Sequence, residues 1–383
     1  MMWEIAKLGD ISKNIQTGPF GSQLHQSDYS ECGIPVVMPK DLVGGKISEE
    51  SIARVDKTHV ERLCRHKIEV GDILYSRRGD VGRCAHVTKK EEGWLCGTGC
   101  LRVTIDSEKA DSRFVFFQLQ HPDTVGWVEK HAVGATMLNL NTTILSSVPI
   151  RLPALEVQKR IADILSAYDD LIENTQKQIK LLEEAVQRLY KEWFVDLRFP
   201  GHENTKIVDG VPEGWSRTNI NEILTFHRGY DLTKNEMKAG RYPVVGSTTV
   251  IGYHNEFKIK GPGIVTGRSG SLGKYQFIWD NFWPHNTSLY ISDYKDHNIF
   301  FVYSLLQTVD FASLNNGGAI PTLNRNVLSN IEVIEPEKKL QDVFAKIAEP
   351  QYQKIRNLEK QNDRLKTARG LLLPKLMSGE VEV

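Results

Sequence analysis

The sequence predicts an α+β protein of two mixed α/β globules and two long helices that pair as a coiled coil. Three observations lead to this fold class. A heptad-like apolar seam runs through residues 155–194, a second copy of that stretch lies near the C-terminus, and strand and turn patterns precede each copy. The order is globule, helix, globule, helix, which is a pseudo-two-fold internal repeat.

The first long helix carries the clearest periodicity in the chain. Its apolar positions advance by alternating steps of four and three residues, and no Gly or Pro interrupts them. A 3.5-residue period is typical of a helix that packs lengthwise against one partner helix. At about 1.5 Å per residue, the helix forms a rod of roughly 57 Å. We expect the helix-pair interface at Ile161, Leu165, Ile172, Ile179, Leu182 and Leu189, and at Ile355, Leu358, Leu365 and Leu372 of the second copy.

The partner helix is predicted from the internal repeat. Gln158 recurs as Gln341 and Ile172 as Ile355, and identical residues continue at one constant shift along both copies. Upstream of the helices the shift holds for a Leu-Asn pair, whose first copy ends at Asn141. We interpret this Asn and its repeat, Asn324, as helix caps or turns.

The second helix is less regular than the first. Pro350 is expected to kink it or to confine its regular part to roughly 351–373. Asn362 and Arg369 interrupt its seam, and two interpretations stay open: they fix the register of the pair, or they lie on a solvated edge. We expect the pair to be tightest along 172–189 and looser toward Pro350.

The globules are predicted from short strand-like runs bounded by turn residues. Residues 33–37 and 71–75 look like strands and 114–120 like a short helix, while 200–214 is rich in Gly, Pro, Asn and Asp and resembles a linker. The predicted segments are a first globule over 1–150, a first long-helix region over 151–199, a linker and second globule over 200–335, and a second long-helix region over 336–383. The globules differ more than the helices do, which suggests different ligands on one shared frame.

Composition limits the possible functions. The 48 basic and 48 acidic residues cancel, which does not favour a simple nucleic-acid binder. The five cysteines lie in the first third without an N-terminal apolar segment, so we expect a reduced, cytoplasmic protein. The C-x-H pairs at Cys64 and Cys84 lack the usual zinc spacing, and we favour buried thiols and no metal. No apolar run reaches the length of a membrane span.

The order of segments and the local motifs resemble the specificity (S) subunit of type I restriction-modification systems. Residues 17–24, Thr-Gly-Pro-Phe-Gly-Ser-Gln-Leu, followed by Gly-Ile-Pro-Val at 33–36, are similar to the opening of a target recognition domain in that family. Residues 229–232, 242–244 and 281–288 resemble parts of a second, different variety of this domain. The resemblance covers nearly the whole chain.

The resemblance implies a recognition role without chemistry. In this family each globule recognises one half of a split, asymmetric site on double-stranded DNA. The two long helices pack antiparallel, fix the spacing of the half-sites and dock two methyltransferase (modification) subunits. Restriction subunits with nuclease and translocase activity can join them. The partners would use S-adenosylmethionine, ATP and magnesium, and this chain would bind no cofactor and no membrane.

The best candidates for DNA contact lie on two glycine-punctuated basic loops. Arg77, Arg78 and Arg83 follow a predicted strand, and Arg268, Ser269 and Lys274 occupy the matching loop of the second globule. Arg offers paired donors to guanine or phosphate, and flanking glycines allow close approach. A plain basic surface hairpin remains the alternative. Candidates of lower rank are Gln23, Lys40, Lys89, Arg228 and Tyr230.

The sequence does not favour an enzyme. Residues 267–274 nearly match a phosphate-binding loop, but they have five residues between the glycines instead of four, and Tyr275 replaces the Ser or Thr. Nucleotide-binding, metalloprotease and hydrolase motifs are absent. The alternative to a DNA-specificity subunit is an interaction scaffold whose duplicated globules bind other ligands.

Overall fold

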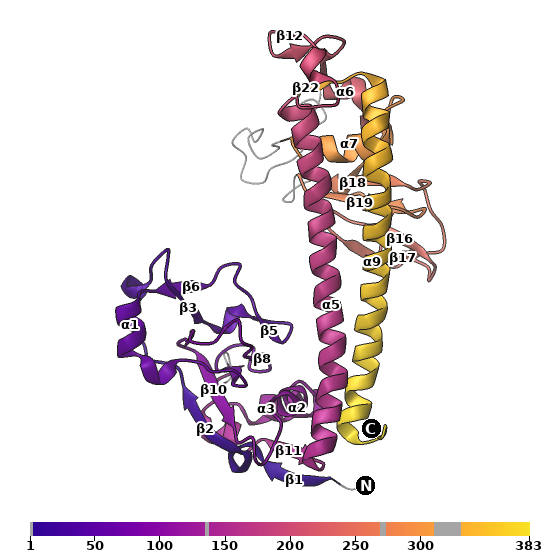
Figure 1. Cartoon of the computed structure of the whole chain (residues 1–383). Helices are drawn as coiled ribbons and strands as arrows, with labels where there is room; N and C mark the ends of the chain where they lie inside the picture. The colour runs from indigo at the N-terminus through magenta and orange to yellow at the C-terminus, as the bar shows by residue number, and fades with distance from the viewer. Residues whose placement is uncertain (1–2, 135–137, 269–272, 310–330) are drawn as a thin grey trace. The chain divides into compact units, whose positions relative to one another are not determined.

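The computed structural model describes residues 3–134, 138–268, 273–309 and 331–383. The chain forms two compact units, each of which combines one globule with parts of both long helices (Figure 1). Residues 1–174 and 361–383 make the first unit, and residues 175–360 make the second. These units are defined by contacts in space, whereas the four predicted segments are defined along the sequence. The boundaries of the segments therefore stay a prediction.

The first globule is built from three main groups of strands. β1 (Glu4–Lys7) pairs antiparallel with β11 (Pro149–Leu152). A four-stranded antiparallel sheet has the order β2 (Ser12–Thr17), β10 (Cys100–Ile105), β7 (Ile73–Ser76) and β8 (Cys84–His86). A three-stranded sheet has the order β6 (Ala53–Val55), β3 (Ile34–Val37) and β9 (Leu95–Cys96), in which β3 and β9 run parallel. β4 (Leu42–Val43) and β5 (Lys46–Ile47) form a small hairpin.

The α-helices described in the first globule are α1 (Lys57–Arg62), α2 (Ser112–Leu119), α3 (Pro122–His131) and α4 (Thr142–Ser146). α2 confirms the predicted short helix. Its Phe114 and Phe117 are fully buried in the core beside the four-stranded sheet. Asn141 caps α4, since its side chain accepts a hydrogen bond from the Ile144 amide (2.8 Å), as predicted. The repeat position Asn324 lies outside the described residues.

The second globule repeats the topology of the three main groups of strands. β14 (Ser216–Asn219) pairs with β22 (Glu332–Glu335). The four-stranded sheet has the order β15 (Thr225–Arg228), β21 (Ser288–Asp293), β18 (Gly263–Gly267) and β19 (Tyr275–Ile278). The three-stranded sheet has the order β17 (Val250–His254), β16 (Tyr242–Val245) and β20 (Trp283–Pro284), again with one parallel pair. The helices described in the second globule are α6 (Ile220–Ile223) and α7 (Ile299–Leu306), and α7 occupies the place of α2.

The two long helices are α5 (Leu155–Tyr190) and α9 (Lys338–Ser378), which contain 36 and 41 residues. α5 continues into a π-helical turn, Lys191–Val195, which extends the helical stretch to the end of the predicted apolar seam over 155–194. α9 runs as one helix through Pro350. Of the two expected effects of Pro350, confinement of the regular part to roughly 351–373 was therefore wrong, and a kink stays a prediction. Pro350 and Lys346, whose carbonyl loses its amide partner, are both exposed to solvent. The turns on either side are held by Phe344 and Tyr352, which are buried in the core.

The long helices run antiparallel within each unit, as the resemblance implied. In the first unit Arg369 pairs with Asp169, while Met377, later on α9, shares a core cluster with Ile161, earlier on α5. In the second unit the rings of Tyr190 and Phe344 lie 5.6 Å apart. Burial and, to a smaller extent, the nearby charge of Glu183, earlier on α5, raise the pKa of Tyr352, later on α9, so the order is again reversed.

The predicted interface residues all lie away from open solvent. Ile161, Leu165 and Ile355 are buried, and Ile172, Ile179, Leu182, Leu189, Leu358, Leu365 and Leu372 are half-buried. Burial does not measure how tightly the two helices pack on each other, so the expectation that the pair is tightest along 172–189 and looser toward Pro350 stays a prediction. Phe344 and Ala348 beside Pro350 are fully buried, because α7 and the π-helical turn cover them. The globules, rather than the helix pair alone, supply the deepest burial.

Two smaller predictions also need correction. The segment 200–214 is not a plain linker, because β12 (Ile207–Val208) and β13 (Val211–Pro212) form a short hairpin there. Of the two cysteines in C-x-H pairs, Cys84 is buried, which raises the pKa of its thiol to about 12, but Cys64 is exposed. In the described parts of the chain no three His, Cys, Asp or Glu side chains gather to hold a metal. None of the helices described has an apolar stretch that could cross a bilayer.

Candidate nucleic-acid interface

The strand register brings three loops of the first globule to one edge of its four-stranded sheet. β2 ends at Thr17 beside the start of β10, and β7 ends at Ser76 beside the first residue of the same strand, Cys100. Paired positions lie side by side, so the loops after β2 and β7 meet the loop before β10. This arginine edge comprises loops 18–24, 77–83 and 97–99.

Backbone hydrogen bonds tie the three loops together. The Gly18 amide donates to the Cys100 carbonyl (2.9 Å), and the Arg77 amide donates to the Gly99 carbonyl (2.8 Å). The Gly97 amide donates to Val37 at the end of β3 (2.9 Å). A Cβ on Gly18 would lie 2.0 Å from the Gly97 carbonyl oxygen, so only glycine fits there. The loop that carries Arg77 is therefore fixed to the sheet at its first residue.

The second globule has the same set of contacts at the corresponding edge. The Gly229 amide donates to Ser288 (3.0 Å), the Arg268 amide to Thr287 (3.1 Å) and the His285 amide to Val245 (2.9 Å). A Cβ on Gly229 would again lie 2.0 Å from a carbonyl oxygen, that of His285. The arginine edge of the second globule comprises loops 229–232, 268–274 and 285–287, of which 269–272 lie outside the described residues.

The matching frames place Arg77 and Arg268 at equivalent positions, as the predicted loop alignment requires. Arg77 is half-buried, and its Nε has no hydrogen-bond partner among the described residues. Arg78 is exposed. Arg83 pairs with Asp80 (2.7 Å), so one of the three charges is locally compensated. Among the residues that the structure describes, the first edge thus offers two guanidinium groups without a paired carboxylate.

The second edge is partly described. Arg268 and Lys274 are both exposed, and the Thr266 hydroxyl donates to the Lys274 carbonyl (3.0 Å) at the return of the loop. Ser269 lies outside the described residues. Arg228 pairs with Asp231 (3.2 Å).

Tyr230 belongs to an aromatic group beside the second edge. Its hydroxyl lies 3.0 Å from that of Tyr290, and Lys258 lies over the neighbouring Trp283 ring (4.7 Å). Tyr230 is half-buried, so only part of the ring is accessible. Burial raises the pKa of Tyr290, which keeps its hydroxyl neutral.

The remaining candidates lie in different places. Gln23 is on loop 18–24, but its Oε1 accepts a hydrogen bond from the Phe20 amide (3.2 Å) and so shapes the turn. Lys40 follows β3 near the arginine edge and donates to the Ser51 carbonyl (2.8 Å). Lys89 follows β8, which ends at the opposite edge of the sheet, and it pairs with Glu92. The structure therefore does not bring Lys89 to the arginines.

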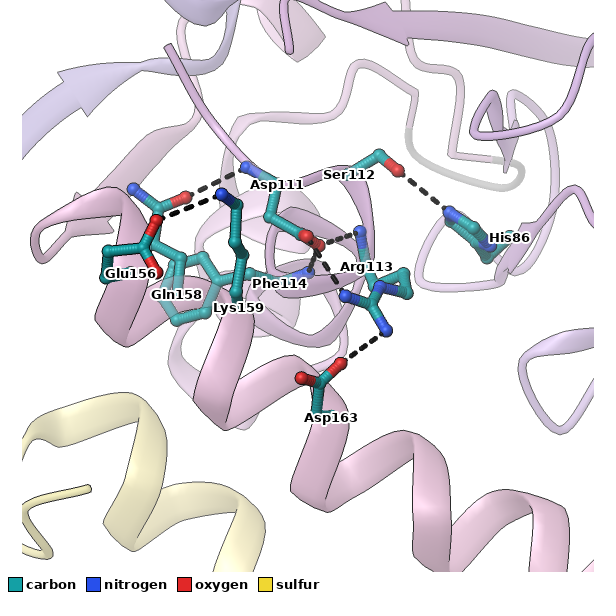
Figure 2. A network of polar contacts seen from close by, with 9 residues as sticks. All are labelled: His86, Asp111, Ser112, Arg113, Phe114, Glu156, Gln158, Lys159 and Asp163. Carbon is teal, nitrogen blue, oxygen red and sulfur yellow. Dashed lines mark hydrogen bonds and ion pairs between the residues drawn. The ribbon is translucent and has the colours of Figure 1, made fainter. Parts of the chain in front are cut away.

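A polar joint fixes the first globule on α5 (Figure 2). Asp111 caps α2 through the amides of Arg113 (2.9 Å) and Phe114 (3.2 Å), and its own amide donates to Gln158 on α5 (3.0 Å). Arg113 also reaches Asp163 on α5 (2.7 Å). The N-terminal end of α2 therefore contacts α5 at two side chains, Gln158 and Asp163, and these contacts orient α2 on α5.

The internal repeat pairs Gln158 with Gln341, but the sequence alone assigns no role to either side chain. Both are buried, and each side chain amide donates to a proline carbonyl before its helix, Pro153 (2.9 Å) or Pro336 (2.8 Å). The repeat of a glutamine at the same position in both copies could have indicated a structural role. A buried amide needs hydrogen-bond partners, so it is kept only where the fold supplies them. Within the described residues, Oε1 of Gln341 has none.

Comparisons with known proteins agree with the architecture. The family description "Type I restriction modification DNA specificity domain" matches residues 2–184 and 212–367. The type I restriction enzyme MjaIX specificity subunit of Methanocaldococcus jannaschii is 26% identical over 415 aligned residues, which cover 100% of this chain and 94% of that protein. The HindI specificity subunit of Haemophilus influenzae is 23% identical and covers 99% of each chain.

A solved structure shares the fold. The S subunit of a type I restriction-modification system from M. genitalium superposes with a TM-score of 0.69 at 20% identity, over 98% of this chain and 96% of that one. The family match spans both globules and most of both long helices. This chain belongs to the type I restriction modification DNA specificity family.

Proposed function

We propose that this chain is the DNA-specificity subunit of a type I restriction-modification complex, and that each globule recognises one half of a split, asymmetric site. The observation that carries the proposal is the duplicated arginine edge. One backbone frame presents a basic loop in both globules, while the surrounding side chains differ. A shared backbone frame with unlike side chains suits two half-sites of different sequence. Contacts to phosphates position the protein on the duplex, and contacts to bases determine which sequence is recognised.

The two long helices serve as spacer and docking element in this proposal. Their seams are occupied by the helix pair, yet Leu181 on α5 and Leu371 on α9 are 64% and 65% exposed. Single exposed leucines are common on protein surfaces, so the docking role rests on the family match, which includes most of both helices. We assign this role to two methyltransferase subunits, which a restriction subunit with nuclease and translocase activity can join.

The chain itself carries out no chemistry in this proposal. The basic loops, the capped turns and the aromatic group beside Tyr230 suit binding. S-adenosylmethionine, ATP and magnesium would be used by the partner subunits. An interaction scaffold for other ligands is less favoured, because the family match includes both globules.

The test is to map modified bases in the genome of a host that expresses this chain together with its methyltransferase subunit. We expect one bipartite, asymmetric motif with a gap of fixed length, absent when the chain is omitted. The purified pair should also retain duplex DNA with the same preference. Modification that does not depend on this chain, or a pair without any sequence preference among duplexes, would refute the proposal.

A further inference from the structure

The arginine edge of the first globule also presents an aromatic ring, Phe20. The side chain is 54% exposed, although phenylalanine is mostly buried in proteins. It lies on loop 18–24, which meets the loop of Arg77 and Arg78 at the same end of the sheet. Gly21 and Ser22, the next two residues, are exposed and small, so the ring stands without a large neighbour in sequence.

The loop holds Phe20 in place through its backbone. The Phe20 amide donates to Gln23 Oε1 (3.2 Å), and the Gln23 amide donates back to the Phe20 carbonyl (2.8 Å). The Thr98 hydroxyl donates to the Pro19 carbonyl (2.9 Å), which ties the turn to loop 97–99. An exposed ring on a fixed turn is pre-organised for contact, so little conformational entropy is lost on binding.

The second globule has a different residue at this place. Gly18 and Gly229 occupy equivalent positions in the two frames, so Phe20 corresponds to Asp231. Asp231 is a polar residue held by Arg228 (3.2 Å) and Asn286. The backbone is shared, and the apolar ring is specific to the first globule.

We propose that Phe20 makes an apolar contact with a base in the half-site recognised by the first globule. This inference rests on the proposed function. A phenyl ring can contact the C5-methyl group of a thymine at a base edge, or insert between base steps. A single exposed ring on a loop that meets the arginine loop suits a nucleic-acid groove better than a protein partner, because a stable protein interface covers many residues. Phe20 is thus a specificity-determining residue.

The test compares the modified motif of the wild-type complex with those of three variants in the full chain. F20A removes the ring, F20L keeps an apolar side chain, and V70A is the matched control. Val70 is 51% exposed but precedes β7, at the edge of the sheet opposite to Phe20. F20A should lower the preference for one base pair in one half-site about tenfold, with the other half-site unchanged. F20L should retain most of the preference, and V70A should match the wild type.

Two arms then identify the base contact. If the ring contacts a thymine methyl group, a duplex with uracil at the relaxed position should weaken wild-type binding but not F20A binding. If it inserts between bases, 2-aminopurine beside that position should brighten with the wild type and stay dim with F20A. Either result supports the proposal.

Three results would overturn the contact. They are an F20A motif identical to the wild type, a uniform loss across both half-sites, and loss of the folded complex in both F20A and F20L, which would make the residue structural. Failure of the wild-type complex to produce any bipartite motif is a separate result, which refutes the proposed function instead.

Discussion

At the scale of single residues, the two globules keep their backbone contacts and change their side chains. Gly18 and Gly229 cannot be replaced without a clash, whereas Phe20 and Asp231, two positions later, share nothing chemically. Recognition of different sequences on one frame requires this division, because the frame positions the loops and the side chains select the bases. The basic loops could be predicted from their glycines. Phe20 could not, because its exposure depends on how the turn packs.

The first residue-scale prediction concerns the two equivalent arginines. R77A should relax recognition in one half-site only, and R268A in the other half-site only, since each removes one guanidinium from one edge. A lost base contact should cost about 1–3 kcal/mol, and a lost phosphate contact should weaken binding to all sequences. Motif mapping together with binding at two salt concentrations separates the two cases. R198A, an exposed arginine near the end of α5, is the control.

If R77A and R268A instead reduced the amount of folded protein without changing either half-site, the arginines would be structural. Retention of the wild-type motif by both variants would exclude base contacts.

A second residue-scale prediction concerns pH. Burial lowers the pKa of His86 to about 4, from an ordinary value of 6.5, and its ring contacts the Ser112 hydroxyl (3.0 Å) at the start of α2. Between these two values the unfolded chain binds the proton and the folded chain does not, so stability falls as the pH falls below 6.5. At pH 5 the loss should be about 2 kcal/mol from this residue.

Melting curves of the wild type and H86N between pH 7 and 5 check this expectation. The variant should lose less stability over that interval, whatever its stability at pH 7. An equal pH dependence in both proteins would contradict the assigned pKa shift.

At the scale of elements, the heptad pattern predicted the helix pair well, since every expected interface residue is at least half-buried. The pattern failed where burial comes from other elements. Pro350 remains within α9 because its own turn faces solvent, while the turns beside it are buried by α7. A proline inside a helix lowers helix stability by about 3 kcal/mol, and this cost can be predicted from the sequence. The packing of the neighbouring turns against α7 offsets it. The apolar pattern of α9 cannot predict that α7, which is distant in sequence, packs against it.

Arg369 supports a test of register at this scale. Its guanidinium makes two hydrogen bonds to Asp169 (2.6 and 3.1 Å) and one to Gln120 (3.1 Å), and it lies over the Phe117 ring. Of the two interpretations that the sequence left open, this geometry favours a register-fixing role over a solvated edge. R369A should destabilise the protein by about 1.5–3 kcal/mol, since a charged hydrogen-bonded pair is broken.

A double-mutant cycle with D169A measures this coupling, and thermal unfolding is a suitable readout. The exposed pair of Arg188 and Glu184 is the control, where E184A should change stability by less than about 0.5 kcal/mol. A coupling energy near zero between Asp169 and Arg369 would place the arginine among ordinary surface charges.

At the scale of the whole molecule, each compact unit contains one end of each long helix. The first unit includes residues 361–383, and the Gln118 side chain donates to the Met377 carbonyl (3.2 Å) there. The internal repeat predicted two globules and two helices. The repeat did not predict that each long helix would be shared between the two units. A repeat shows which parts of the sequence are similar, and it does not show which parts are in contact.

This division suggests where the spacer can be lengthened. The chain passes between the units at Asn174–Thr175 on α5 and at Lys360–Gln361 on α9. Inserting seven residues at both points keeps the seam in phase, because seven residues are one repeat of the 3.5-residue period. Each helix grows by about 10 Å, which is close to the length of about three base pairs. The modified motif should therefore keep the letters of both half-sites and gain about three base pairs in its gap.

Motif mapping in cells that express the lengthened chain and its methyltransferase subunit gives the gap length directly. Insertion in one helix alone is the control, and it should abolish or strongly reduce modification because the pairing within one unit is then out of step. A change in the half-site letters would show that the helices take part in base recognition. An unchanged gap with full modification would show that the helices do not set the spacing.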